Sequence, residues 1–91
     1  MDFLPVGSVV RLKDGIKKLL IVGRCQVNSE TNELWDYLGC LYPEGILGED
    51  MNFVFNSSDI DEICHRGFED EEERELLEKA IAFKNGEKYE K

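Results

Sequence analysis

Three short runs of apolar residues, each bounded by turn-forming residues, constrain the fold of this chain more than any other feature of its sequence. In the first run, over residues 8–13, apolar and basic residues alternate from Val10 to Lys13. This period of two is typical of a strand with one buried face. Asp14-Gly15 follows directly and predicts a tight hairpin turn, because glycine adopts the positive φ angles that such turns require. The beginning of the chain therefore predicts two antiparallel strands.

The second run begins at about Lys17 and predicts the central strand of a sheet. Its residues Leu19–Val22 are consecutively apolar, so both faces of the strand are expected to be covered there. Gly23 has no side chain to pack and predicts a bulge or a bend. The third run, from Leu34 to Tyr42, carries apolar residues on both alternating faces and ends where Pro43 removes a hydrogen-bond donor.

The second half of the chain predicts two further strands and a helix. Alternation over residues 51–56 indicates a fourth strand whose core-facing residues are Met51, Phe53 and Phe55. Residues 57–61 then predict a single helical turn, and residues 63–65 a short fifth strand before Gly67; a helix through Arg66 is the alternative for this segment.

After Phe68 the sequence predicts an amphipathic helix. The acidic residues 69–73 place negative charge at the positive end of the helix dipole. Apolar residues then recur with a period of 3.6, at Leu76, Leu77, Ala80, Ile81 and Phe83. We expect one domain over residues 1–91, with a β-core over 4–67, a C-terminal helix over 69–84 and a tail over 85–91 that begins at Asn85-Gly86.

The order of these elements predicts an α+β fold. A small antiparallel sheet of about five strands is expected to curl into an SH3-like barrel, with the C-terminal amphipathic helix packed on it. The barrel is preferred because the second and third strands look covered on both faces. An open four-stranded meander with two helices on one face is the alternative that the same periodicities permit.

The charge of the chain excludes several classes of partner. Its 20 acidic and 11 basic residues give a net charge of −9, and residues 51–91 carry 12 acids against 6 bases. Phosphate backbones and anionic lipid headgroups repel such a chain, so we expect it to bind neither nucleic acid nor a membrane surface. The first residues lack a signal peptide and no segment approaches the roughly 20 apolar residues of a membrane span, which predicts a cytoplasmic protein.

The residues that carry chemistry are few. Cys25, Cys40 and Cys64 are odd in number and not spaced as metal ligands, so we expect free thiols. Cys64 precedes His65, the single histidine, but neighbours on a strand point to opposite faces and do not form a nucleophile with its base. A thiolate enzyme using Cys40 or Cys64 is disfavoured because no base or oxyanion device accompanies either residue. We therefore predict no catalytic residue, cofactor, metal or small-molecule substrate, and a protein that is not an enzyme.

Several blocks over about residues 4–80 carry a family resemblance. They lie at residues 4–13, 18–24, 35–45, 55–61 and 67–72, and the most specific of them is Tyr42-Pro43-Glu44-Gly45. These blocks resemble a family of small uncharacterised proteins, a domain of unknown function, whose members are encoded beside LXG toxins of Gram-positive type VII secretion systems.

The resemblance implies a cytoplasmic accessory protein that is a chaperone or export adaptor for a neighbouring LXG toxin. An immunity protein that neutralises such a toxin is the alternative. The family implies no catalytic residue. Aromatic residues are enriched both in cores and at interfaces, so the predicted partner-binding residues combine the aromatic residues of the third strand with its terminal turn: Trp35, Tyr37, Tyr42, Pro43, Glu44 and Gly45.

Overall fold

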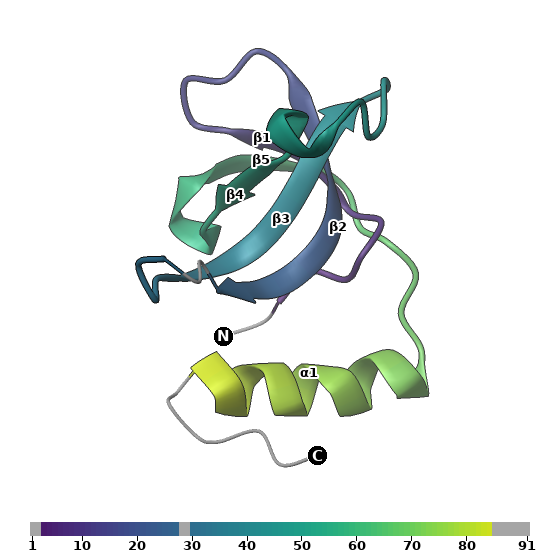
Figure 1. Cartoon of the computed structure of the whole chain (residues 1–91). Coiled ribbons are helices and arrows are strands. Elements are labelled where there is room, and N and C mark those ends of the chain that lie inside the picture. Colours follow the sequence, from purple (N-terminus) through teal and green to yellow (C-terminus); the bar gives the residue numbers. More distant parts are fainter. Residues whose placement is uncertain (1–2, 28–29, 85–91) are drawn as a thin grey trace.

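The computed structural model describes residues 3–27 and 30–84, and every structural statement below refers to these residues. Figure 1 shows a curled sheet with one helix lying across its lower end. The elements, in chain order, are strands β1 (Val9–Leu12), β2 (Lys18–Val27) and β3 (Leu34–Tyr42), the 3₁₀ turn η1 (Glu49–Met51), strand β4 (Phe53–Phe55), the 3₁₀ turn η2 (Ser57–Asp59), strand β5 (Ile60–His65) and helix α1 (Glu71–Lys84).

The sheet has five strands in the order β4-β3-β2-β1-β5, and all neighbouring strands are antiparallel. β2 is the central strand, as its consecutive apolar residues predict. The single turn predicted over residues 57–61 is present but ends at Asp59, and the fifth strand predicted over 63–65 is present but begins at Ile60. The alternative helix through Arg66 is wrong. A hydrogen bond from the backbone N–H of Ser57 to the buried carboxylate of Asp36, 2.9 Å long, holds η2 against β3.

The prediction of a closed SH3-like barrel is wrong, because the sheet is open. Among the described residues, β4 pairs only with β3 and β5 only with β1, so these two edge strands do not pair with each other. Only three residues of β4 join the sheet before the chain turns into η2. The alternative of a four-stranded meander with two helices is also wrong, since the described residues form five strands and one α-helix. The α+β class and the C-terminal helix are confirmed.

Two glycine positions shape the central hairpins. The pairing of β2 with β3 shifts register between Ile21 and Gly23, which is the predicted bulge. In the turn between β1 and β2, the residue with positive φ is Asp14, at 63°, and not Gly15 as expected. Aspartate tolerates this conformation because its short polar side chain bonds locally. The turn is closed by the backbone N–H of Gly15, which donates to the carbonyl of Leu12 over 3.0 Å.

The core lies inside the curl of the sheet and is completed by the segment that precedes β1. That segment contributes buried Phe3 and Leu4, and the backbone N–H of Leu4 donates to the hydroxyl of Tyr37 over 2.9 Å. The hydrophobic core cluster of buried residues comprises Phe3, Leu4, Val10, Leu19, Ile21, Tyr37 and Phe55.

The expectation that the whole aromatic face of β4 enters the core is wrong for two of its three residues. Phe55 is buried, but Met51 and Phe53 are both more than one third exposed. Phe53 faces a groove between β4 and the β1–β2 turn. The N-terminal segment closes the other end of the curl, around Tyr37 and Phe55, and leaves this end open.

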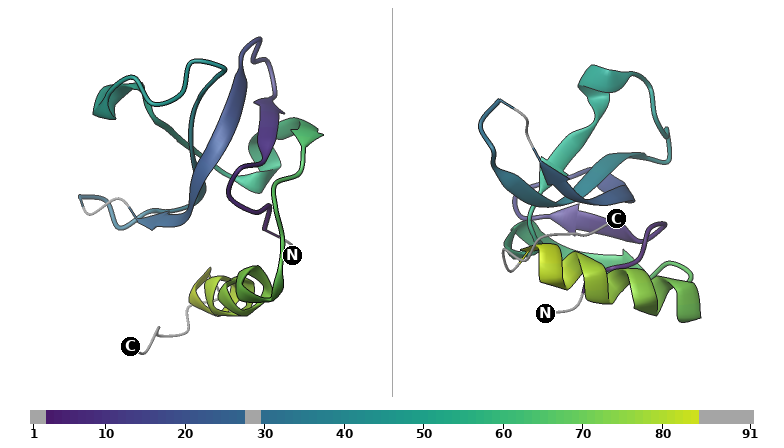
Figure 2. Two further views of the ribbon diagram at one scale, coloured as in Figure 1. Left: turned by 90° about the vertical axis from the view of Figure 1, so that its right-hand side faces the viewer. Right: turned by 60° about the horizontal axis from the view of Figure 1, so that its bottom comes forward.

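Helix α1 lies across one end of the curled sheet (Figure 2). Apolar contacts and one buried ion pair hold it against β2 and the core. Leu77, Ala80 and Ile81 pack against the core cluster. The guanidinium of Arg24 on β2 donates to both carboxylate oxygens of Glu73, over 2.5 and 2.8 Å. The two side chains are only 5% and 13% exposed. The predicted tail over 85–91 and its first residues, Asn85-Gly86, lie outside the described residues.

Candidate protein-binding surfaces

The residues predicted to bind a partner do not share one surface. Tyr37 is a core residue, 1% exposed, and is not available at the surface. Trp35 lies on β3 opposite Gln26 and is partly buried. Tyr42, Pro43 and Glu44 are exposed at the end of β3. The structure therefore separates Trp35 and Tyr37 from Tyr42 and the terminal turn.

The turn after β3 is fixed by its own hydrogen bonds and by a contact with the β1–β2 turn. The Tyr42–Pro43 peptide bond is cis, Gly45 has a φ of 84°, and its N–H donates to the carbonyl of Leu41 over 2.7 Å. The ammonium of Lys17 donates to Glu44 over 2.7 Å. This hydrogen bond, assisted by one from the backbone of Glu44 itself, lowers the pKa of the Glu44 carboxyl below its ordinary value.

A groove with a mostly apolar lining lies beside this turn, and we call it the hairpin-end groove. Its exposed apolar side chains are Ile16, Phe53 and Val54, which are 98%, 41% and 43% exposed. The groove has a volume of about 430 Å³ and its other lining residues are Leu12, Asp14, Gly15, Lys17, Leu19 and Leu41. One sequence signal marks this groove, the isolated Ile16 inside a polar turn, and Ile16 is not among the predicted partner-binding residues.

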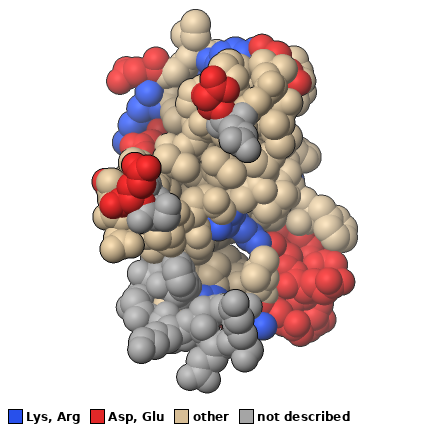
Figure 3. All heavy atoms as spheres, viewed as in Figure 1, with Lys and Arg blue, Asp and Glu red and all other residues tan. Residues whose placement is uncertain are grey.

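A second groove lies where the chain leaves β5, passes the N-terminal segment and enters α1. We call it the acid-rimmed groove; its volume is about 470 Å³. It is lined by Val6, Arg24, Phe68, Asp70, Glu72, Glu73 and Leu76. Phe68 is 80% exposed, and Val6 and Leu76 are half-exposed. In Figure 3 acidic side chains gather over the beginning of α1, beside this groove.

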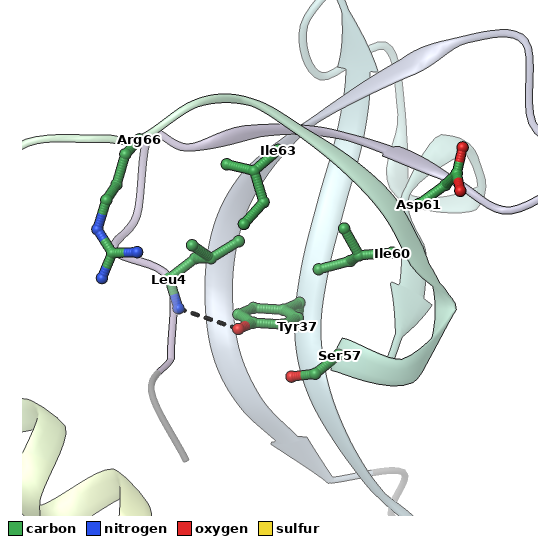
Figure 4. A pocket seen from close by; sticks show the side chains of 7 residues that line it. All are labelled: Leu4, Tyr37, Ser57, Ile60, Asp61, Ile63 and Arg66. Atoms are coloured by element: carbon green, nitrogen blue, oxygen red, sulfur yellow. Dashed lines mark hydrogen bonds between the residues drawn. The ribbon is translucent and has the colours of Figure 1, made fainter.

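A third hollow, of about 430 Å³, separates the N-terminal segment from β5 (Figure 4). Leu4, Ile60 and Ile63 surround the ring of Tyr37, whose hydroxyl already accepts a hydrogen bond from Leu4. The charged groups do not converge there, since Asp61 and Arg66 lie at opposite ends of the hollow. This arrangement offers no paired acid and base for chemistry.

The cysteines occupy three different environments, and Cys25, Cys40 and Cys64 are not joined in disulfide bonds. The thiol of Cys25 donates to the carbonyl of Ala80 over 3.6 Å, Cys40 is buried, and Cys64 is exposed. Cys64 and His65 are neighbours on β5. Among residues 3–27 and 30–84, no group of three or more His, Cys, Asp or Glu side chains could hold a metal ion. No helix in the same residues is long and apolar enough to span a bilayer.

The family model for a domain of unknown function, DUF4176, matches residues 3–76. The chain belongs to the DUF4176 family. This confirms the resemblance to a domain of unknown function. The match covers the whole sheet and the first turns of α1, so both grooves are formed by DUF4176 residues. No curated protein and no solved structure matches the chain.

Proposed function

We propose that this DUF4176 protein is a non-enzymatic cytoplasmic accessory protein that binds an LXG toxin of a type VII secretion system, as a chaperone or export adaptor. The observation that carries the proposal is the hairpin-end groove, where Ile16, Phe53 and Val54 expose apolar surface beside an edge strand. Contiguous exposed apolar surface of this kind marks sites of protein association.

The edge strand offers backbone groups as well as apolar side chains. β4 pairs with β3 on one side, and no described strand pairs with its other side. An extended segment of a partner can add to such an edge, since main-chain hydrogen bonds supply affinity and a neighbouring pocket selects a side chain. The turn from Tyr42 to Gly45 borders this groove through the Lys17–Glu44 contact. It is thus placed to contact the same partner.

The sequence supports an LXG toxin as the partner. The blocks of sequence that place the chain in its family include the Tyr42-Pro43-Glu44-Gly45 turn, and the family resemblance implies a neighbouring toxin gene. A binding protein needs no catalytic constellation, which fits the scattered positions of Cys25, Cys40 and Cys64.

Co-expression of the neighbouring toxin with and without this protein tests the proposal. We expect the toxin to become more soluble and to co-purify with the tagged chain. Ile16→Ser should weaken co-purification, whereas Ile46→Ser should not, because Ile46 is also exposed but does not line the groove. Unchanged toxin solubility together with no co-purification would contradict the proposal.

A protection assay distinguishes the alternative role. Cells that produce the toxic domain alone should not be protected by this chain if it acts before export on another part of the toxin. Protection in that assay would identify an immunity protein and overturn the chaperone proposal.

A further inference from the structure

The acid-rimmed groove presents a different chemistry from the hairpin-end groove. Its apolar part is formed by Val6, Phe68 and Leu76, which come from the N-terminal segment, the β5–α1 connection and α1. Its rim carries Asp70 and Glu72. Apolar surface with charges of a single sign at its edge favours a partner whose apolar side chains are flanked by the opposite charge.

The acidic rim is not neutralised by the basic residue that lies in the groove. Arg24 already binds both carboxylate oxygens of Glu73, with its side chain almost completely buried. Around the groove, residues 66–79 contain seven acidic and three basic residues, and one of the basic residues, Arg66, is paired with Glu69. The local excess of negative charge therefore remains available to an incoming cation.

We propose that the acid-rimmed groove binds a basic amphipathic helix of the partner protein. The apolar face of that helix would contact Phe68 and Leu76, and its Lys and Arg side chains would face Glu72 and the neighbouring acids. This inference rests on the proposed function in so far as it places the helix in a protein partner.

The walls of the groove favour a helix over an extended segment. One wall is the beginning of α1, where the backbone N–H groups of Glu73 and Arg74 already donate to the side chain and the carbonyl of Asp70. A docked segment must therefore satisfy its own backbone hydrogen bonds, which a helix does. Helix-in-groove recognition uses an apolar face in this way. A second copy of this chain is a poor occupant, because its net charge of −9 repels the same acidic rim.

A pair of synthetic peptides tests the inference with the full chain. Each is a helix of about 18 residues, which is five turns, with leucines on one face and either lysines or glutamates on the other. Binding is followed by fluorescence anisotropy at low salt and at physiological salt. We expect the lysine peptide to bind at least about tenfold more tightly than the glutamate peptide, with an affinity that falls as salt rises.

Matched variants locate the binding. Phe68→Ser and Leu76→Ser should each lower the affinity of the chain for the lysine peptide by about fivefold or more. Glu72→Gln should weaken it as well. Glu78→Gln removes the same charge from an exposed position of α1 outside the groove, and should change the affinity by less than about twofold. Circular dichroism of each variant establishes that α1 is still formed, and Phe68 is exposed enough to be replaced without loss of packing.

Three results would overturn the inference: equal binding of the two peptides, unchanged binding by Phe68→Ser and Leu76→Ser, or an equal effect of Glu72→Gln and Glu78→Gln. Self-association through this face would also overturn it. If the toxin co-purifies with the chain but the lysine peptide does not bind, this inference is contradicted and the proposed function is not. If the lysine peptide binds at the groove but the toxin does not co-purify, the proposed function is contradicted and this inference is not.

Discussion

The Arg24–Glu73 ion pair predicts that the attachment of α1 to the sheet depends on one charged contact. Glu73→Gln removes the negative charge and leaves the guanidinium of Arg24 buried opposite an amide. The two side chains are 5% and 13% exposed, so water cannot replace the lost carboxylate. Breaking a buried pair by removing one partner costs about 3–5 kcal/mol, most of it from the charge left without compensation.

That cost is large for this chain. A domain of 91 residues is expected to have a free energy of unfolding of about 5–14 kcal/mol. Among the described side chains, the other residues of α1 that pack against the core cluster are Leu77, Ala80 and Ile81, which are only partly buried. We therefore expect Glu73→Gln to detach α1 before the sheet unfolds.

Two probes measure this separately in urea. Trp35, the single tryptophan, lies on β3 and reports the sheet by fluorescence, whereas far-ultraviolet circular dichroism is dominated by α1. In Glu73→Gln the helical signal should be lost at lower urea than the fluorescence change, and amide exchange should rise in α1 more than in β2. The two transitions should be closer together in the unaltered chain.

Two controls make the test decisive. Glu69→Gln breaks the ion pair with Arg66, whose side chains are 48% and 36% exposed, and should cost less than about 1 kcal/mol. The double variant Arg24→Met with Glu73→Leu replaces the pair by apolar groups and should recover stability to within about 1 kcal/mol. A cost for Glu73→Gln no larger than that for Glu69→Gln would refute the reasoning.

Three further predictions concern the sheet and its turns. Gly67→Ala places a Cβ 2.6 Å from the backbone oxygen of Val6. It should lower the free energy of unfolding, measured in urea, by about 3 kcal/mol. A decrease of less than about 1 kcal/mol would show that the two segments separate easily. Tyr37→Phe removes the acceptor of a buried backbone N–H and should cost about 1–3 kcal/mol, and an unchanged urea midpoint would contradict that hydrogen bond. The hydrogen bond from Lys17 lowers the pKa of the Glu44 carboxyl. The contribution of this hydrogen bond to stability is therefore present above the ordinary carboxyl value of 4.5 and is lost as pH falls through the lowered pKa. In Lys17→Met the NMR resonance of Glu44 should titrate at higher pH, and an unchanged midpoint would exclude Lys17 as the cause of the lowered pKa.

Patterns between near neighbours in the sequence predicted much of the secondary structure. β3 spans Leu34–Tyr42 as predicted, the bulge lies at Gly23, and α1 begins within two residues of the expected position. These features depend on side-chain alternation, on backbone freedom at one residue and on charge beside a helix end. Each of these causes acts over a few residues, which is why a linear pattern shows it.

The candidate surfaces were less predictable. The sequence predicts partner binding at the Tyr42–Gly45 turn, whose first three residues are exposed, but Tyr37, which is predicted with it, is a core residue. The residues that line the two grooves are far apart in the chain, such as Ile16 with Phe53 and Val6 with Leu76. No local pattern marks such pairs, because they meet only after the sheet curls and α1 docks.

The sequence by itself determined the strands, their turns, the bulge and the acidic helix, together with membership of the DUF4176 family. The tertiary structure alone decided that the sheet stays open, that the N-terminal segment closes the core, and that Phe53 and Phe68 remain exposed. It also brought Arg24 to Glu73, which is 49 residues further along the chain. The physical reason is that periodicity specifies which face of an element is apolar, whereas long-range packing decides which part of that face is covered.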